Sequence, residues 1–229
     1  MKGNFNIVDI SQPVATSTAC FPGDIPFSRQ VTLDYQQSGE INLCAFTMSP
    51  HVGTHADAPI HIQGNLAQPD EQSPTIGQLA LSPFVGPAAV IELSPWHQAI
   101  TWAQVEPQLT AWPEFPQRIL FKTQTQNRAE LFQPPYAWPD AALIEELARR
   151  GVVLVGIDTP SVDHVDSKTL DTHHALQHAG MAWLENLDLS QAPTLSPGQA
   201  LPFLVALPLK LMEMEASPVR AVLLTDWAQ

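Results

Sequence analysis

One segment of the chain, residues 139–157, restricts its possible folds more than any other. A helix is expected from Pro139 to Arg150, because proline favours the first turn, two arginines suit the last turn and Gly151 follows directly. An unbroken apolar run from Val152 to Ile157 comes next, which is typical of a strand buried on both faces. The chain is therefore expected to contain a buried central strand that follows a helix.

Other segments add strands and short helices. Apolar runs predict strands at Phe5–Ile10, Gln30–Tyr35, Ile41–Met48, Ala88–Leu93 and Arg118–Thr123. The second and third runs flank a polar stretch and predict a hairpin, whose second strand is expected to hold His51 rigidly. Thr75 and Thr101 each precede a glutamine by three residues, which is the pattern of a capping box. The first box is expected to open a short helix around Leu79 and Leu81.

Three of the eight histidines and one aspartate lie within residues 51–61. A glycine and a proline in this stretch disfavour a helix, so a strand end that runs into a loop is expected. The polar residues share odd-numbered positions, which would place them on one side of an extended segment. His51, His55 and Asp57 then form the ligand mix that suits zinc or a neighbouring transition metal. The alternative is that these are polar loop residues whose side chains form hydrogen bonds with the backbone. Adjacent imidazolium groups would then repel one another unless a metal or a carboxylate compensated their charge.

A second group of ligand-capable side chains lies between Ser161 and Leu189. Its members are Asp163, His164, Asp166, Asp171, His173, His174, His178 and Glu185. Spacing alone does not settle the choice among them, but His174 and His178 are four residues apart and would share a helical face, so they are the pair that the residues themselves favour for a metal. Asp158 precedes a Thr-Pro pair and is interpreted as a turn stabiliser.

The first cluster fits a longer motif, HxGTHxDxPxH, which also includes His61. This motif resembles the signature of the cyclase-like metal-dependent amidohydrolases, and within them the bacterial kynurenine formamidases. Further similar segments follow one another in order over nearly the full length: Asp9–Ser11, Phe21–Asp24, Gly156–Ser161, Leu184–Leu187, Ala206–Lys210 and Ser217–Ala221.

The resemblance implies a single α/β domain over residues 1–229, with a mixed sheet of the swivelling β/β/α type, assembled as a homodimer or larger homo-oligomer. It also implies two divalent metal ions, Zn²⁺ first, with Mn²⁺ or Co²⁺ possible. The implied ligands are His51, His55 and Asp57 for one ion, and Asp57, His173 and Glu185 for the other. His173 and Glu185 thereby take precedence over the pair favoured by spacing.

The reaction implied by the resemblance is hydrolysis of N-formyl-L-kynurenine to L-kynurenine and formate, a step of tryptophan degradation. His61 would be the general acid/base, and Phe21, which stands where the family typically has tryptophan, would line the pocket for the aryl ring. A related enzyme acting on a cyclic imide or lactam such as isatin, and a metal-binding protein without catalysis, are the alternatives. A serine hydrolase is disfavoured because the chain has no GxSxG motif.

Composition limits the partners. A net charge of −13 with ten basic residues disfavours nucleic acid and anionic membrane surfaces, because both are bound largely through lysine and arginine. The first residues lack the apolar stretch of a signal peptide, and no run of eighteen apolar residues occurs. The two cysteines, Cys20 and Cys44, do not form a CxxC pair, which fits a reducing compartment. A cytoplasmic protein acting on a small molecule is therefore expected.

Overall fold

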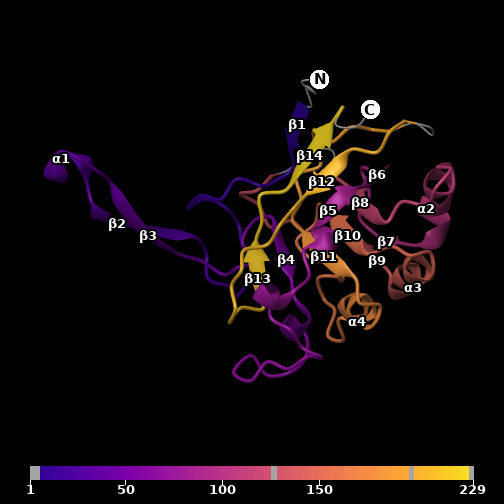
Figure 1. Ribbon diagram of the computed structural model, residues 1–229, viewed down its shortest axis with the longest axis horizontal. Coiled ribbons are helices and arrows are strands. Elements are labelled where there is room, and N and C mark those ends of the chain that lie inside the picture. The colour runs from indigo at the N-terminus through magenta and orange to yellow at the C-terminus, as the bar shows by residue number, and fades with distance from the viewer. Residues whose placement is uncertain (1–5, 125–127, 196–198, 227–229) are drawn as a thin grey trace.

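The computed structural model describes residues 6–124, 128–195 and 199–226 of the 229-residue chain (Figure 1). Its strands are β1 Asn6–Asp9, β2 Ser28–Leu33, β3 Leu43–Thr47, β4 His55–Asp57, β5 Val85–Pro87, β6 Ala89–Glu92, β7 Ala99–Ile100, β8 Arg118–Lys122, β9 Trp138–Pro139, β10 Leu154–Ile157, β11 Ala182–Glu185, β12 Phe203–Val205, β13 Ala216–Pro218 and β14 Val222–Thr225. The α-helices are α1 Tyr35–Ser38, α2 Trp102–Leu109, α3 Ala141–Arg149 and α4 Asp171–His178, and the 3₁₀ turns are η1 Pro59–His61, η2 Ile76–Gln78 and η3 Ser82–Phe84. None of the described helices is both long and apolar enough to cross a membrane.

The central sheet orders six of these strands as β13-β4-β11-β10-β8-β6. Strands β6, β8, β10 and β11 run parallel to one another, whereas β4 is antiparallel to both β11 and β13. Strand β10 corresponds to the predicted apolar run and is buried at every residue. The prediction of a buried central strand is therefore confirmed.

Each face of the central sheet packs against a different layer. On one face, Ile119 and Phe121 of β8 join a core with side chains of α2, α3 and α4, such as Leu143. On the other face, Leu120 joins a core with Leu223 of a four-stranded sheet ordered β1-β14-β12-β5. Successive residues of a strand point to opposite faces, so the apolar run fills both cores. Figure 1 shows α2, α3 and α4 together on the side away from β1 and β14. These β/β/α layers confirm the predicted α/β class and its mixed sheet.

Two of the three predicted helices form, and the third is only a short turn. Helix α3 begins after Asp140, whose side chain accepts a hydrogen bond of 2.7 Å from the Leu143 amide as an N-cap. Helix α2 begins at the predicted capping box of Thr101. The box at Thr75 also forms, but it opens only the 3₁₀ turn η2, and Leu79 is already extended. The prediction of a helix around Leu79 and Leu81 is therefore wrong.

The predicted hairpin is confirmed as β2 and β3, which pair antiparallel and carry α1 at their tip. Figure 1 shows this hairpin projecting as an arm away from the layered body. Every residue of β3 is exposed. The expectation that this strand rigidly holds His51 is therefore wrong, because the buried strand of the cluster is β4.

Candidate metal centre

Strand β4 forms the base of the candidate site. It lies in the central sheet between β11 and β13, and all three of its residues are buried. The register places His55 directly opposite Glu185 of β11. Because Ala56 separates them, His55 and Asp57 point to the same face of the sheet. The sheet register thus joins the first cluster to a carboxylate 130 positions later in the chain.

The other histidines of the first cluster arrive through turns. His51 precedes a turn at Gly53, whose φ of 71° suits glycine, and a Cβ there would lie 2.8 Å from Val14. His61 ends the turn η1, and its ring centroid lies 4.5 Å from that of His51. The expectation that one extended segment aligns these residues is therefore wrong, although they do converge. Strand β4 is extended, whereas residues 59–61 form the turn η1.

His173 enters the site from the first turn of α4, where it is buried. Asp163, in the loop after β10, accepts hydrogen bonds from the backbone amides of Thr172 and His173 at 2.9 and 3.1 Å. The same carboxylate lies 2.6 Å from His173 Nδ1, which must donate to it. This bond leaves His173 Nε2 facing the other ligand-capable side chains. His174 and His178 do not line the cavity described below.

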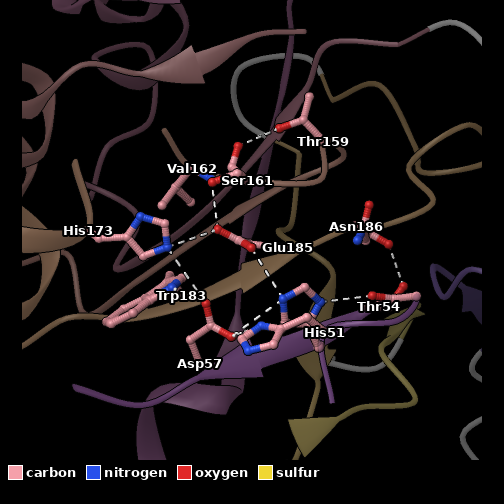
Figure 2. Close-up of polar contacts among 12 residues, drawn as sticks. His51, Thr54, Asp57, Thr159, Ser161, Val162, His173, Trp183, Glu185 and Asn186 are labelled. Atoms are coloured by element: carbon pink, nitrogen blue, oxygen red, sulfur yellow. Dashed lines mark hydrogen bonds and ion pairs between the residues drawn. The ribbon is translucent and has the colours of Figure 1, made fainter. Parts of the chain in front are cut away.

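Five side chains meet in this cluster: His51, His55, Asp57, His173 and Glu185. Figure 2 labels His51, Asp57, His173 and Glu185 among them. Their imidazole nitrogens and carboxylate oxygens are separated by 3.1 to 3.7 Å. Two ligands bound at about 2.0–2.2 Å to one tetrahedral ion would lie about 3.3–3.6 Å apart. Three buried atoms of the cluster, His55 Nε2, Asp57 Oδ1 and His173 Nε2, have no hydrogen-bond partner among the described residues. Because an unpaired buried polar atom costs about 1–3 kcal/mol, this set of donors fits a divalent metal ion.

Each of the two carboxylates of the cluster has its two oxygens near different histidines. Asp57 Oδ1 lies 3.1 Å from His51 Nδ1, and Asp57 Oδ2 lies 3.7 Å from His173 Nε2. Glu185 Oε2 lies 3.2 Å from His55 Nε2, and Glu185 Oε1 lies 3.4 Å from His173 Nε2. The five side chains could therefore provide two adjacent positions for a metal ion.

Neighbouring groups fix the orientation of these side chains. The indole nitrogen of Trp183 donates to Asp57 Oδ2 at 3.1 Å, as Figure 2 shows. The Val162 amide donates to Glu185 Oε1 at 2.7 Å. His55 Nδ1 lies 2.8 Å from the carbonyl oxygen of residue 53, so Nδ1 carries the proton and Nε2 is the available ligand atom. Such outer contacts commonly orient metal ligands.

The cluster strongly perturbs its own ionisation. Burial lowers the pKa of His51, but the charge of Asp57 and contacts with Asp57 and Glu215 outweigh it and raise that pKa to about 10. Burial also opposes the charged form of His173, yet its bond to Asp163 raises the pKa well above 6.5. Because an ion must displace these protons, metal affinity is expected to fall as the pH falls.

His61 differs from the other histidines of the site. Desolvation in the cavity lowers its pKa below 6.5; the charge of Asp57 opposes this shift, whereas charged His51 and His173 add to it. His61 is also more exposed than the other histidines of the cluster. Near neutral pH its ring is therefore neutral and open to the cavity.

The bond between Asp163 and His173 gives a direct test of ligand positioning. In an Asp163→Asn variant, we expect metal affinity to fall about 10- to 100-fold, because the neutral amide orients the imidazole less firmly. Competition with a chromogenic chelator would measure this affinity. Asp166→Asn, in the same loop but exposed, is the matched control and should bind as the parent does. Equal affinities for both variants would contradict the assignment.

A cavity of about 900 Å³ opens over the cluster. The predicted residues that line it are Phe21, His51, His61, His173 and Glu185. Its aromatic wall continues beyond Phe21 to Phe132, whose ring centroid lies 5.1 Å away at an interplanar angle of 72°. Phe21 therefore lies within reach of a molecule bound at the cluster.

Some residues of the site were not assigned by sequence reasoning. Glu215 precedes β13, lines the cavity and lies 3.6 Å from His51 Nε2. Asp163 was one of the ligand-capable residues in the second group. Its role of orienting His173 could not be predicted, because it depends on how the Asp163 loop packs against the start of α4. Tyr136 and Phe132 lie in a Pro-rich segment without a periodic pattern. Glu215 could have been proposed from the sequence, because it is a carboxylate close to the family-like Ser217–Ala221 segment.

Asp158 fits its interpretation as a structural residue. Its carboxylate accepts from the backbone amides of Thr123 and Gln124 at 2.8 and 2.9 Å, and from Thr123 Oγ1 at 2.6 Å. Burial raises its pKa to about 7, although these hydrogen bonds oppose the shift. The residue thus ties the ends of the adjacent strands β8 and β10.

Comparisons with known proteins show the family of this chain. A family model described as a putative cyclase matches residues 8–164, which is more than half of the chain. A protein named kynurenine formamidase from Paracidovorax citrulli is 42% identical over 95% of both chains. One of the same name from Bordetella pertussis is 39% identical over 94% of this chain and 96% of its own.

Solved structures share the fold at lower identity. A potential metal-dependent hydrolase with cyclase activity has a TM-score of 0.76 at 23% identity, covering 99% of this chain and 100% of its own. Isatin hydrolase A from Labrenzia aggregata has a TM-score of 0.79 at 21% identity, covering 96% and 93%. Fold and site together define a mixed α/β hydrolase with a cluster suited to a divalent metal. The chain belongs to the cyclase family. The resemblance drawn from the signature is confirmed.

Proposed function

We propose that this chain is an arylformamidase that hydrolyses the formamide of N-formyl-L-kynurenine to L-kynurenine and formate. The observation that carries the proposal is the 42% identity over 95% of both chains with the kynurenine formamidase of Paracidovorax citrulli. This reaction needs an activated water, a group that protonates the departing nitrogen and an apolar wall for the aryl ring. The chain offers a candidate for each need.

The metal centre would hold two divalent ions, zinc most readily, with manganese or cobalt as alternatives. His51, His55 and Asp57 would bind one, and Asp57, His173 and Glu185 would bind the other. Bound ions would polarise a carbonyl oxygen and make water acidic enough to ionise near pH 7. The unpaired buried atoms and the separations of 3.1 to 3.7 Å support this assignment.

His61 would act as the general acid/base. Its ring lies 4.5 Å from that of His51 and 5.7 Å from that of His173, on the side that lines the cavity. A neutral ring at this position can take a proton from water and pass it to the departing nitrogen. Because an aniline-like leaving group needs less protonation than an alkyl amine, one histidine is sufficient.

The cavity wall would bind the rest of the substrate. Phe21 and Phe132 offer edge-to-face aromatic surfaces for an aryl ring. Arg128 is exposed and is the one lysine or arginine among the described residues that line the cavity. The proposed substrate carries an amino-acid carboxylate, and a guanidinium is the donor group best shaped to bind one. Arg128 is therefore assigned to that carboxylate.

This assignment predicts a selective loss in the variant Arg128→Met. The KM for N-formyl-L-kynurenine should rise about 10-fold, the effect of losing about 1.4 kcal/mol of a charge-assisted hydrogen bond. The KM for formanilide, which has no carboxylate, should stay unchanged. Arg149→Met, an exposed arginine of α3, is the matched control. An equal change of KM for both substrates would show that Arg128 does not bind the carboxylate.

The proposed function is tested by assaying the purified protein, with its metal content measured, on N-formyl-L-kynurenine and on isatin. We expect formate release from the first substrate and much slower opening of the second. Chelation should abolish turnover, and zinc, manganese or cobalt should restore it. Metal-loaded protein that opens isatin but leaves the formamide intact would refute the proposal.

A homodimer is also proposed, supported by the arm formed by β2, α1 and β3. Val31, Leu43 and Phe46 on this arm are 50%, 50% and 66% exposed. Exposed apolar side chains on a projecting element commonly mark a protein interface, and identical chains most often assemble as symmetric pairs. Sedimentation equilibrium should give the mass of at least two chains; the mass of one chain at micromolar concentration would contradict this proposal.

A further inference from the structure

Tyr136 carries a hydroxyl for which the described part of the chain provides no hydrogen-bond partner. The residue is 4% exposed, so water reaches it poorly. It lines the same cavity as His61, His173 and Glu185. Burying a hydroxyl without a partner destabilises a protein, because the bonds that it made with water are lost. An unused donor at the wall of a reaction cavity therefore needs an explanation.

The position of Tyr136 is well fixed relative to the metal centre. Its ring packs edge-to-face on Phe132, with centroids 6.2 Å apart at 78°. The next residue, Ala137, is fully buried in the core that α3 and α4 share with the central sheet. Two residues further on, the carbonyl of Pro139 accepts a hydrogen bond of 2.7 Å from the hydroxyl of Thr172, the neighbour of His173. The segment that carries the tyrosine is thus tied to the helix that carries a metal ligand.

The surroundings keep this hydroxyl protonated. Burial raises the pKa of Tyr136, and the nearby carboxylates of Glu185 and Asp163 act in the same direction. A neutral phenol among carboxylates is a hydrogen-bond donor over the whole physiological range. The group is therefore suited to an electron-rich oxygen of a ligand in the cavity.

We propose that the Tyr136 hydroxyl donates a hydrogen bond to the carbonyl oxygen of the scissile formamide. This role rests on the proposed arylformamidase function. Negative charge grows on that oxygen when water attacks the carbonyl carbon, so a fixed donor stabilises the transition state more than the bound substrate. Tyr136 would then be a further catalytic residue, which acts on kcat more than on KM.

The variant Tyr136→Phe tests the proposal, because it removes one oxygen atom and keeps the ring. The metal-loaded variant should lose at least about 10-fold and up to about 10³-fold in kcat, with KM changed less than about 3-fold. The loss should be the same with N-formyl-L-kynurenine and with formanilide, which shares only the scissile group. Metal content should equal that of the parent. The Tm without substrate should be at least as high as the parent's, because the described residues provide no partner for the removed hydroxyl.

The chain contains two tyrosines, so Tyr35→Phe, on the exposed α1, is the matched control and should change none of these quantities. A clearly lower Tm for Tyr136→Phe would mean that the hydroxyl has a structural partner and would overturn the proposal. A loss of kcat below 10-fold on either substrate would overturn it as well, and a loss restricted to N-formyl-L-kynurenine would assign the bond to another oxygen. A parent enzyme that hydrolyses neither substrate would instead refute the proposed function itself.

Discussion

Replacing Asp57 with asparagine should remove bound metal and lower the rate of formamide hydrolysis by more than about 10³-fold, because water is then no longer activated near pH 7. Asp57 is the carboxylate shared by both proposed ion positions, with Oδ1 near His51 and His55 and Oδ2 near His173. Asparagine has nearly the same shape and can still accept the hydrogen bond from Trp183. The loss would therefore reflect the missing negative charge more than altered packing.

Elemental analysis after gel filtration and a formate-release assay would measure both effects of Asp57→Asn. The matched control is Asp9→Asn, the same substitution in an exposed ion pair with Arg220. Exposed ion pairs contribute about 1 kcal/mol or less to the free energy of unfolding, so the Asp9→Asn control should stay folded and keep its metal and its activity. An Asp57→Asn enzyme that retains two equivalents of metal and parental activity would invalidate the proposed metal centre.

Replacing His61 with alanine should lower kcat by about 10²- to 10⁴-fold, the usual contribution of a general acid/base. The metal content should not change, because the five proposed ligands are other residues. Added imidazole should restore part of the rate, since it can enter the vacated space and carry the proton. Steady-state kinetics with and without imidazole, together with metal analysis, would test this role.

His178→Ala is the matched control for this experiment, because His178 is an exposed histidine in the last turn of α4. It should behave as the parent enzyme does. If His61→Ala loses metal together with activity, then His61 is a ligand, as its position within 4.8 Å of ligand atoms of His51 and Asp57 would permit. Unchanged kcat with full metal content would exclude both roles.

Much of the fold could be predicted from local patterns. The run from Val152 to Ile157 became the buried β10, and the segment from Pro139 to Arg150 became α3, each within two residues of the expected bounds. A strand that is buried on both faces requires consecutive apolar residues, and a helix end requires particular residue types beside it. Both features are therefore visible in the local sequence. The hairpin was predicted for the same reason, but nothing in its pattern indicated that it projects from the body.

In the candidate site, too, the residues that are close in sequence could be predicted to lie together, whereas the distant ones could not. His51, His55, Asp57 and His61 are within eleven residues, so the chain brings them together through two turns and a short strand. Choosing His173 over His174 could not be done from spacing, because it depends on which face of α4 packs toward the sheet. The residues alone favoured His174 and His178, and only the family resemblance pointed to His173 instead.

The sequence by itself determined the chemistry available to this protein: a dense cluster of imidazoles and carboxylates, an acidic net charge and a buried strand that follows a helix. Tertiary structure alone decided that Glu185 lies opposite His55, that Asp163 caps α4 and holds His173, and that no described residue pairs with the Tyr136 hydroxyl. The physical reason is that sheet register and helix packing are set by the whole core. Local propensity describes the neighbours of a residue along the chain, whereas these contacts join segments about ten to 130 positions apart.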